Sequence, residues 1–359
     1  MSGPAGLERS MASQATNSSA IGSMEANASI LLIRLKSIGD ILFTLPAVHR
    51  VRGAFPEARI SFLVSKEYAP LLEGFRDLDH IITMDRARLR QRNPVAIARE
   101  MVGLLGRLRR PRFSLAVDFQ GYGETALLTW WTGAPQRWGS VYRPSRRWAY
   151  TRAATRDDRI HIADWNLSLL HQCGLEPWPS RNEFHLPPHA RQAALEFFAA
   201  SGCDPAKPTL LIQPFTSSPI KNWPLEKYLV LAKHWRAAGM QVIFSGGPAD
   251  HASLEPARQG GFVTSAGLSL LATAGLMELS SLVVGGVTGL LHLAVAMQKR
   301  VVMLIGYPAS EPGFPYQHHD WAVTARDSSP AASISVESVI GATAHALVEL
   351  GVSPSAAPS

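Results

Sequence analysis

Val283–Gly306 reads VVGGVTGLLHLAVAMQKRVVMLIG, and this pattern predicts a βαβ unit. The short apolar run Leu282–Val284 suits a buried strand, and two glycines are expected to end it. From Thr288 onward, apolar residues recur at helical spacing. Val301–Ile305 is a second strand-like run, closed by a glycine. A strand, a turn, a helix and a strand in this order make up the unit.

The turn before this helix suits an anion. Free backbone N–H groups and the positive end of the helix dipole face the ligand at such a turn, and the ligand is most often a phosphate. Thr288 is a candidate N-cap, and His292 lies one turn into the helix. A plain βαβ crossover with a histidine in its core fits the same residues, so both interpretations stay open here.

Length and composition limit the classes of protein to consider. The 359 residues allow two domains, and 46% hydrophobic with 18% charged residues is a globular composition. Two cysteines make no disulfide framework, which favours a reducing compartment. The net charge of +7 is uneven: residues 1–185 hold 25 Lys and Arg against 17 Asp and Glu, and residues 186–359 hold 10 against 11. A basic half suits an acidic substrate or an anionic lipid surface, although a merely solvated surface has the same composition.

Two α/β domains are predicted, residues 29–185 and 186–350, joined in the proline-rich stretch 177–188. Residues 1–28 and 351–359 are expected to be disordered, and the first of these segments lacks the apolar core of a signal peptide. No apolar run is long enough to span a bilayer, so a role at a membrane would be peripheral.

The first domain opens like a nucleotide-binding half-domain. A strand at Ile30–Leu35, a turn, a helix and a strand at Ile60–Val64 follow one another, but the fingerprint G-x-G-x-x-G is missing. Asp40 stands in the turn, where a carboxylate either acts as a base or stabilises the helix N-terminus. Asp118 stands at the end of a later strand, where a structural hydrogen bond is the alternative to a binding role.

Trp130–Arg159 is rich in arginine and aromatic residues and is predicted to form loops and short helices over the site or a membrane face. Guanidinium groups such as those of Arg143 and Arg146 pair bidentately with carboxylates and phosphates. An acidic glycolipid suits this segment. Core aromatic residues with exposed arginines are the alternative.

The second domain repeats the pattern from a predicted strand at Thr209–Gln213. The next loop holds three hydroxyl residues, Thr216, Ser217 and Ser218, and the basic residue Lys221. A helix begins near Pro224, so hydroxyls, a lysine and a helix N-terminus together predict a cradle for a diphosphate.

Four separated motifs resemble those of the ADP-heptose:lipopolysaccharide heptosyltransferases, glycosyltransferase family 9. They are Ser37-Ile38-Gly39-Asp40 with Thr44-Leu45-Pro46, Asp118-x-Gln120-Gly121, Lys221-x-Trp223-Pro224, and Thr288-Gly289-Leu290-Leu291-His292-Leu293-Ala294. The resemblance covers about Ile30 to Leu350. It implies two Rossmann-like α/β domains facing across a cleft, the GT-B arrangement. The implied activity is inverting, metal-independent transfer of heptose from ADP-heptose to a lipopolysaccharide inner-core acceptor.

The resemblance also implies roles for individual residues. Asp40 is the expected general base, which takes the proton of the acceptor hydroxyl, and Lys221 is expected to neutralise the departing ADP. The donor site would comprise Thr216, Ser217, Ser218, Lys221, Asp250, Val287, Thr288, Gly289 and His292. The acceptor site would comprise Ser37, Gly39, Asp118, Gln120, Gly121, Arg143 and Arg146.

Val287 departs from the family pattern, which has an acidic residue at this position. Valine accepts no hydrogen bond, and leaving a buried donor group unsatisfied costs about 1–3 kcal/mol, or about 5- to 150-fold in binding or turnover. The chain is therefore a slower heptosyltransferase, a transferase for another nucleotide sugar, or a catalytically silent nucleotide-sugar-binding protein. A nucleotide-sugar epimerase on the same fold is a further alternative.

The expected partners are a nucleotide-sugar donor, an acidic glycolipid acceptor and the anionic surface of the inner membrane. No nucleic acid is expected, because no recognition motif accompanies the arginines. No metal site is predicted either: Asp77-Leu78-Asp79 resembles a metal-binding Asp-x-Asp only superficially, and His318-His319 stands alone. The expected location is cytoplasmic, with a peripheral position on the cytoplasmic face of the membrane.

Overall fold

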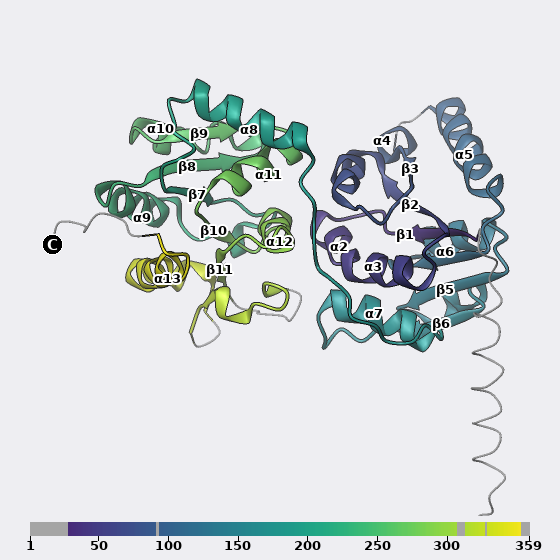
Figure 1. Cartoon of the computed structure of the whole chain (residues 1–359). Helices are drawn as coiled ribbons and strands as arrows, with labels where there is room; N and C mark the ends of the chain where they lie inside the picture. The colour runs from purple at the N-terminus through teal and green to yellow at the C-terminus, as the bar shows by residue number, and fades with distance from the viewer. Residues whose placement is uncertain (1–27, 91–92, 307–312, 327–328, 353–359) are drawn as a thin grey trace, which may run out of the picture. The chain divides into compact units, whose positions relative to one another are not determined.

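A computed structural model describes residues 28–90, 93–306, 313–326 and 329–352 (Figure 1). The chain divides into two compact units, Met1–Asn182 and Glu183–Ser359, so the division falls within the predicted linker. The segments predicted to be disordered lie almost wholly outside the described residues. No helix in the described part of the chain is both long enough and apolar enough to cross a membrane.

The first unit is a parallel sheet of order β3-β2-β1-β4-β5-β6 with helices on both faces. Its elements are β1 (Ser29–Ile33), α2 (Ile38–Leu42), α3 (Leu45–Ala54), β2 (Arg59–Ser65), η1 (Lys66–Gly74), β3 (His80–Met84), α4 (Arg86–Leu89), α5 (Pro94–Arg109), β4 (Leu115–Asp118), α6 (Gly123–Trp131), β5 (Gln136–Val141), η2 (Pro144–Ala149), β6 (Arg152–Thr155) and α7 (Ile162–Gln172). This strand order is that of the Rossmann fold.

The second unit repeats this topology, with the order β12-β11-β10-β7-β8-β9. Its elements are α8 (Pro188–Ala200), β7 (Thr209–Gln213), η3 (Pro219–Lys221), α9 (Leu225–Ala237), β8 (Gln241–Gly246), η4 (Pro248–Asp250), α10 (Glu255–Gln259), β9 (Val263–Ala266), α11 (Leu270–Leu279), β10 (Leu282–Gly286), α12 (Gly289–Ala296), β11 (Val301–Ile305), η6 (His319–Trp321), β12 (Ala322–Thr324), η7 (Ala331–Ser333) and α13 (Val336–Glu349). The βαβ unit predicted from Val283–Gly306 is β10, α12 and β11.

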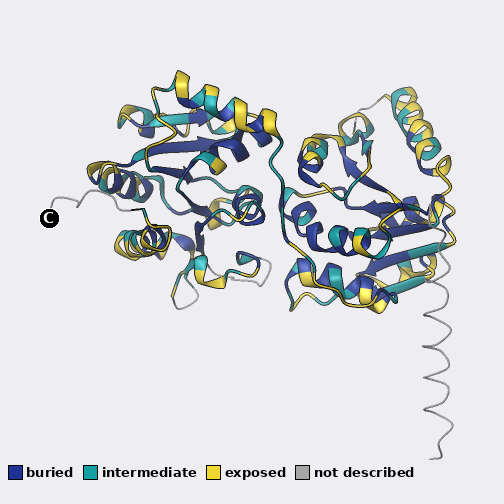
Figure 2. Ribbon diagram, viewed as in Figure 1, coloured by how far each residue is buried: buried dark blue, intermediate teal, exposed yellow. Residues whose placement is uncertain are grey.

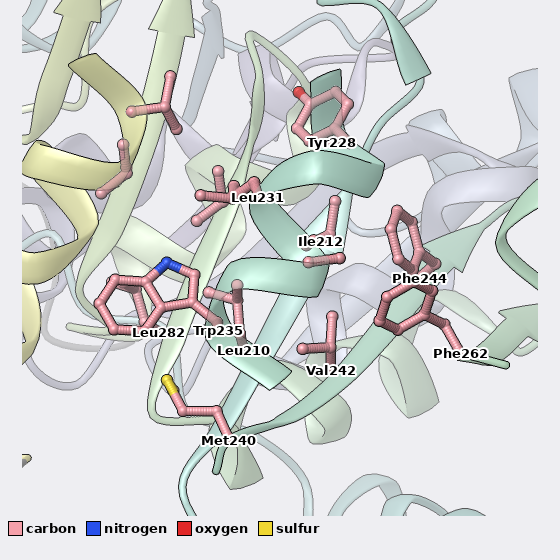
Figure 3. Close-up of a cluster of buried hydrophobic side chains, with 14 of the residues drawn as sticks. Leu210, Ile212, Tyr228, Leu231, Trp235, Met240, Val242, Phe244, Phe262 and Leu282 are labelled. Atoms are coloured by element: carbon pink, nitrogen blue, oxygen red, sulfur yellow. The ribbon is translucent and has the colours of Figure 1, made fainter. Parts of the chain in front are cut away.

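The central strands β7, β8, β10 and β11 of the second sheet are buried on both faces, which explains their apolar runs. Figure 3 shows Tyr228, Leu231 and Trp235 of α9 over Leu210 and the neighbouring strand residues of one face. The alternate strand residues pack against α8, α11 and α12 on the other face. Figure 2 shows the same contrast across each unit, with buried strands and helices whose outer sides are exposed.

Two local predictions are wrong, and one short strand was not predicted. Trp130–Arg159 is not a set of loops and short helices, because it supplies β5 and β6, whose Trp138 is completely buried. Gly285 does not end its strand: a Cβ there would lie 2.5 Å from the backbone oxygen of Gln213, so glycine lets two neighbouring strands approach. The three-residue edge strand β12 escaped prediction because so short a segment shows no periodicity.

Candidate functional site

The strand order locates the expected binding edge in each unit. In doubly wound sheets, ligands bind outside the carboxyl ends of the strands, where the strand order reverses. This point lies between β1 and β4 in the first unit and between β7 and β10 in the second. All four sequence motifs lie on the segments that leave these strands.

Asp40 lies in α2, directly after β1, and its carboxylate is held through one oxygen. Oδ2 forms an ion pair with Arg34 Nη2 at 2.9 Å and accepts hydrogen bonds from the backbone N–H and the Oγ of Ser37, each at 3.2 Å. Oδ1 has no hydrogen bond within the described residues. The side chain is 28% exposed, so this second oxygen is available to a substrate.

Arg34 is a residue of the site that the sequence motifs did not indicate. It is 4% exposed and donates hydrogen bonds to the carbonyl oxygens of Lys36 (3.1 Å) and Phe119 (2.8 Å), besides its contact with Asp40. One guanidinium therefore ties the ends of β1 and β4 to the carboxylate. The available signal was a lone arginine inside the apolar run ILLIRL, since a buried charge requires partners.

Asp118 has a structural role in place of the predicted contact with an acceptor. It is completely buried, and Oδ1 accepts the N–H groups of Gln120 and Gly121 while Oδ2 accepts the Tyr150 hydroxyl at 2.7 Å. Burial raises the pKa of the Asp118 carboxyl, and the hydrogen bonds from Gly121 and Tyr150 act in the opposite direction. Burial and the neighbouring carboxyl also raise the pKa of Tyr150 far above its usual range.

The other predicted acceptor residues surround this carboxyl-end edge. Gln120 is buried, and its Oε1 accepts the Leu35 N–H at 2.9 Å, so it joins β4 to β1. Gly121 has a φ of +70°, and Arg146 donates to its carbonyl oxygen at 2.8 Å. Arg143 is exposed.

Of the residues flanking Asp40 in its motif, Ser37 is exposed and Gly39 is buried. Ser37 therefore lies open to solvent beside the catalytic candidate, whereas Gly39 packs within α2.

In the second unit, the loop after β7 folds on itself. Thr216 Oγ1 donates to the Ser218 carbonyl at 2.8 Å, and the Thr216 N–H donates to Oδ1 of Asn222, another residue that the motifs missed. Ser217 and Lys221 are exposed. The Lys221 side chain has no ion pair within the described residues, so its charge is available to an anion.

The loop after β7 and the start of α12 meet at Gly286. A Cβ on Gly286 would lie 2.7 Å from Thr216 Cγ2 and 3.2 Å from the Lys221 carbonyl oxygen. Two motifs about seventy residues apart in sequence are therefore in contact, because β7 and β10 are neighbours.

The N-terminus of α12 is built as predicted. Thr288 caps the helix, with Oγ1 accepting the Leu291 N–H at 3.2 Å, and Gly289 is the first helical residue. His292 is 6% exposed in the first turn. Val287 is half-buried and packs against the apolar cluster that holds α12 to the sheet, so a valine at this position is in apolar contact.

Asp250 caps the turn after β8, since its Oδ2 accepts the Gly247 N–H at 2.8 Å. Nearer the sheet, three residues lie at or one residue before the carboxyl ends of β7, β8 and β9: Gln213, Ser245 and Ser265. Each has a buried side-chain oxygen without a hydrogen bond in the described part of the chain. Buried polar atoms ordinarily have a partner, so we expect water or a ligand hydroxyl to reach this row.

The described residues contain no group of three His, Cys, Asp or Glu side chains placed to hold a metal ion. Asp77 contacts His49 at 3.0 Å, and Asp79 pairs with Arg52, so both carboxylates of the Asp-x-Asp sequence are engaged. His318 and His319 stack on Trp321 and Phe314.

Comparison with known proteins agrees with this architecture. The model of the family described as "Glycosyltransferase family 9 (heptosyltransferase)" matches residues 101–341. Lipopolysaccharide heptosyltransferase 1 of Pseudomonas aeruginosa is 25% identical over 79% of this chain and 80% of its own length.

Solved structures show the same fold. A family 9 glycosyl transferase from Veillonella parvula has a TM-score of 0.80 at 21% identity, covering 91% of this chain and 99% of that chain. The ADP-heptose lps heptosyltransferase II of E. coli has a TM-score of 0.73 at 19% identity, covering 89% and 99%. These similarities confirm the predicted class of two Rossmann-like α/β domains. Weaker similarity, with TM-scores of 0.53 and 0.51, extends to the iron-containing heptosyltransferase TibC and to a UDP-GlcNAc 2-epimerase from Methanocaldococcus jannaschii.

Proposed function

The chain belongs to glycosyltransferase family 9, and we propose that it transfers heptose from ADP-heptose to a lipopolysaccharide inner-core acceptor, with inversion and without a metal ion. The observation that carries this proposal is the carboxylate of Asp40. Its Oδ2 is held by Arg34 and Ser37, and its Oδ1 is free of protein partners in the described residues.

In the proposed step, Asp40 Oδ1 accepts the proton of the acceptor hydroxyl. The acceptor oxygen then forms a bond to the anomeric carbon of the sugar while the bond from that carbon to the ADP oxygen breaks. Attack opposite the leaving group inverts the configuration. Because Oδ2 is held by Arg34 and Ser37, Oδ1 is the oxygen that accepts the proton. The same contacts restrict rotation of the carboxylate, so the base is oriented before the acceptor binds.

We assign the donor to the carboxyl-end edge of the second unit. Its diphosphate would lie at the N-terminus of α12, where the dipole and free N–H groups favour an anion. Lys221, exposed on the adjoining loop, would neutralise the charge that develops on ADP, and this protein cation is the support for a metal-independent reaction. Thr216, Ser218 and Thr288 shape the cradle through their loop and cap hydrogen bonds.

The acceptor would bind the first unit, at the carboxyl-end edge of its sheet. Two exposed residues lie there: Ser37, three residues before Asp40, and Arg143, which follows β5. The free thiols Cys173 and Cys203 fit the cytoplasmic location that belongs to this proposal. An acidic glycolipid rather than a nucleic acid is the proposed polyanionic partner.

The test is release of ADP from ADP-heptose, with and without deacylated Kdo-lipid A as acceptor. Wild type should release ADP only with acceptor, and Asp40→Asn should lose turnover while still binding ADP. Asp204→Asn is a matched control, because Asp204 caps a turn in the donor unit before the amino end of β7 and belongs to neither proposed site. Retained turnover in Asp40→Asn would remove Asp40 from the role of base.

Val287 supports one alternative, a transferase that uses another nucleotide sugar. One result would support it: wild type releases no ADP from ADP-heptose, whereas Val287→Asp does. The natural chain then either uses a different donor or is catalytically silent. Assays with a panel of nucleotide sugars distinguish these two cases. Turnover of a nucleotide sugar without any acceptor would instead indicate an epimerase.

A further inference from the structure

The first unit exposes six large apolar side chains on α6, its N-cap and the neighbouring η2 segment. We call this set the aromatic stripe; its members are Tyr122, Leu127, Trp130, Trp131, Tyr142 and Trp148. Four of them belong to α6 or its N-cap, where the spacing of three and four residues places Leu127, Trp130 and Trp131 on one helix side. Trp148 is 57% exposed and Leu127 is 51% exposed, far above the values of core residues.

Two ring pairs join α6 to the segment of η2 and hold the stripe together. Tyr122 and Tyr142 have ring centroids 5.6 Å apart, and Trp130 and Trp148 have centroids 5.9 Å apart. The pairs lie at opposite ends of α6, so η2 runs beside the helix and in the same direction. The stripe therefore extends along the whole nine-residue helix, a length of about 14 Å at 1.5 Å per residue.

Arginines surround this stripe, and their charges are not compensated. In the described part of the chain, three of them donate hydrogen bonds only to backbone carbonyl oxygens. Arg109 donates to Trp131, and Arg147 donates to Ala153. Arg137 donates to Ala134 and Ala149. None of these three, nor Arg143 or Arg146, has an acidic partner among the described residues. The acidic residue of α6, Glu124, is paired with Arg86 at 3.3 Å.

A hollow of about 370 Å³ lies at the far end of the stripe, lined by Arg109, Trp130, Trp131, Gly133 and Arg137. It combines indole surface with two guanidinium groups. This is the chemistry that a phosphate-bearing lipid headgroup requires, with a cation for the phosphate and an amphipathic ring at the boundary to the acyl region.

Charge decides between the possible occupants. A second copy of this chain would bring two sets of uncompensated arginines together, and like charges facing one another across an interface are repulsive. An anionic bilayer satisfies both features, because it attracts the arginines electrostatically and receives the tryptophan rings at headgroup level.

We propose that the aromatic stripe and its arginines dock the first unit on an anionic lipid bilayer. The reason why the protein would bind a membrane rests on the proposed function, because the proposed acceptor is anchored in a lipid bilayer. The stripe begins at Tyr122, next to Gly121 at the carboxyl-end edge that holds Asp40, and it leads away from that edge along α6. Docking through this side keeps the catalytic edge beside the membrane surface without covering it.

The first experiment measures flotation of the full chain with lipid vesicles, with neither donor nor acceptor present. Vesicles of pure phosphatidylcholine are compared with vesicles in which about a quarter of the lipid is phosphatidylglycerol. Binding is expected to the anionic vesicles only, and to weaken as salt screens the arginines. Failure to bind anionic vesicles, or equal binding to both kinds at all salt concentrations, would overturn the proposal.

Variants then locate the surface. Joint replacement Trp130→Ser and Trp148→Ser should weaken vesicle binding by about tenfold or more, because two exposed rings lose their burial in lipid. Arg109→Ser and Arg147→Ser should each weaken it about fivefold. The matched controls Trp178→Ser and Arg76→Ser change an exposed residue outside the stripe and should bind as wild type does. Unchanged binding in the stripe variants would place the membrane contact elsewhere.

Turnover separates this inference from the proposed function. With deacylated acceptor, the tryptophan variant should retain the kcat of wild type, and with vesicle-embedded acceptor its KM should rise by the factor lost in vesicle binding. If wild type shows no transferase activity but binds anionic vesicles through the stripe, the proposed function fails and the docking surface stands. A different outcome would assign the surface to another partner. In that outcome, wild type does not bind vesicles but does form a dimer or bind RNA, and the tryptophan variant loses that association.

Discussion

Arg34→Met tests whether the buried guanidinium positions the proposed catalytic base. Methionine has a similar length and no charge, so the change removes the ion pair with Asp40 and the hydrogen bonds to the carbonyl oxygens of Lys36 and Phe119. Breaking a buried charged pair costs 3–5 kcal/mol, and we expect about 3 kcal/mol because water reaches the partly exposed Asp40. A loss of this size leaves a typical domain folded.

The catalytic effect should be larger than the loss of stability alone explains. Asp40 keeps its two hydrogen bonds from Ser37 but loses the strongest contact at Oδ2, so the carboxylate is less well positioned. Displacements of about 1 Å cost about 100-fold in rate, and we expect kcat to fall between about 10- and 100-fold. The KM for ADP-heptose should not change, because the donor is assigned to the other unit.

The assay is ADP release at saturating donor and acceptor, with urea unfolding measured in parallel. Arg52→Met is the matched control: Arg52 also binds several backbone carbonyl oxygens and one carboxylate, that of Asp79, but it lies at the amino ends of the strands. It should lose stability and keep kcat. A double-mutant cycle with Asp40→Asn completes the test, since Arg34→Met should have little further effect in that background. Equal kcat in Arg34→Met and wild type would refute the reasoning.

Three further predictions concern the donor loop, the buried carboxyl and the thiols. Gly286→Ala places a methyl group against Thr216, and this overpacking should lower the free energy of unfolding by about 1–3 kcal/mol. The KM for donor should rise with little change in kcat. An unchanged KM would show that this contact does not contribute to donor binding. Tyr150→Phe leaves one oxygen of Asp118 without its donor and should lower the free energy of unfolding by about 1–3 kcal/mol, as urea titration would show, with kcat retained. Burial raises the pKa of Cys173 to about 12, so only ~10⁻⁴ of this thiol is ionised at pH 8. In the variant whose other cysteine is serine, a thiol reagent should react only after unfolding, and fast reaction of the native protein would contradict its burial.

The local elements could be predicted because their signals are local. The strand at Thr209–Gln213 and the strand at Val301–Ile305 are continuous apolar runs, and the structure has both with the same bounds. Thr288 was recognisable as an N-cap because a hydroxyl before a helical apolar pattern satisfies a free N–H of the first turn. The motifs around Asp40 and Lys221 were visible for the same reason, since each lies within a few residues of its strand.

What only the tertiary structure decided is which distant residues share an edge. Nothing near Asp118 in sequence indicated that Tyr150 would cover it, and this partner turns the carboxyl inward. Arg34 became part of the site because β1 and β4 are neighbours, although 85 residues separate Arg34 from Phe119.

The sequence by itself determined two Rossmann-like units, their repeated βαβ order and the turns that carry Asp40, Lys221 and Thr288. It did not determine the partners of these residues or which aromatic residues stay outside. Trp138 and Trp148 lie in one arginine-rich segment, yet the first is fully buried and the second is 57% exposed. Secondary structure follows from interactions a few residues apart, whereas burial depends on which strands pair and which faces they cover.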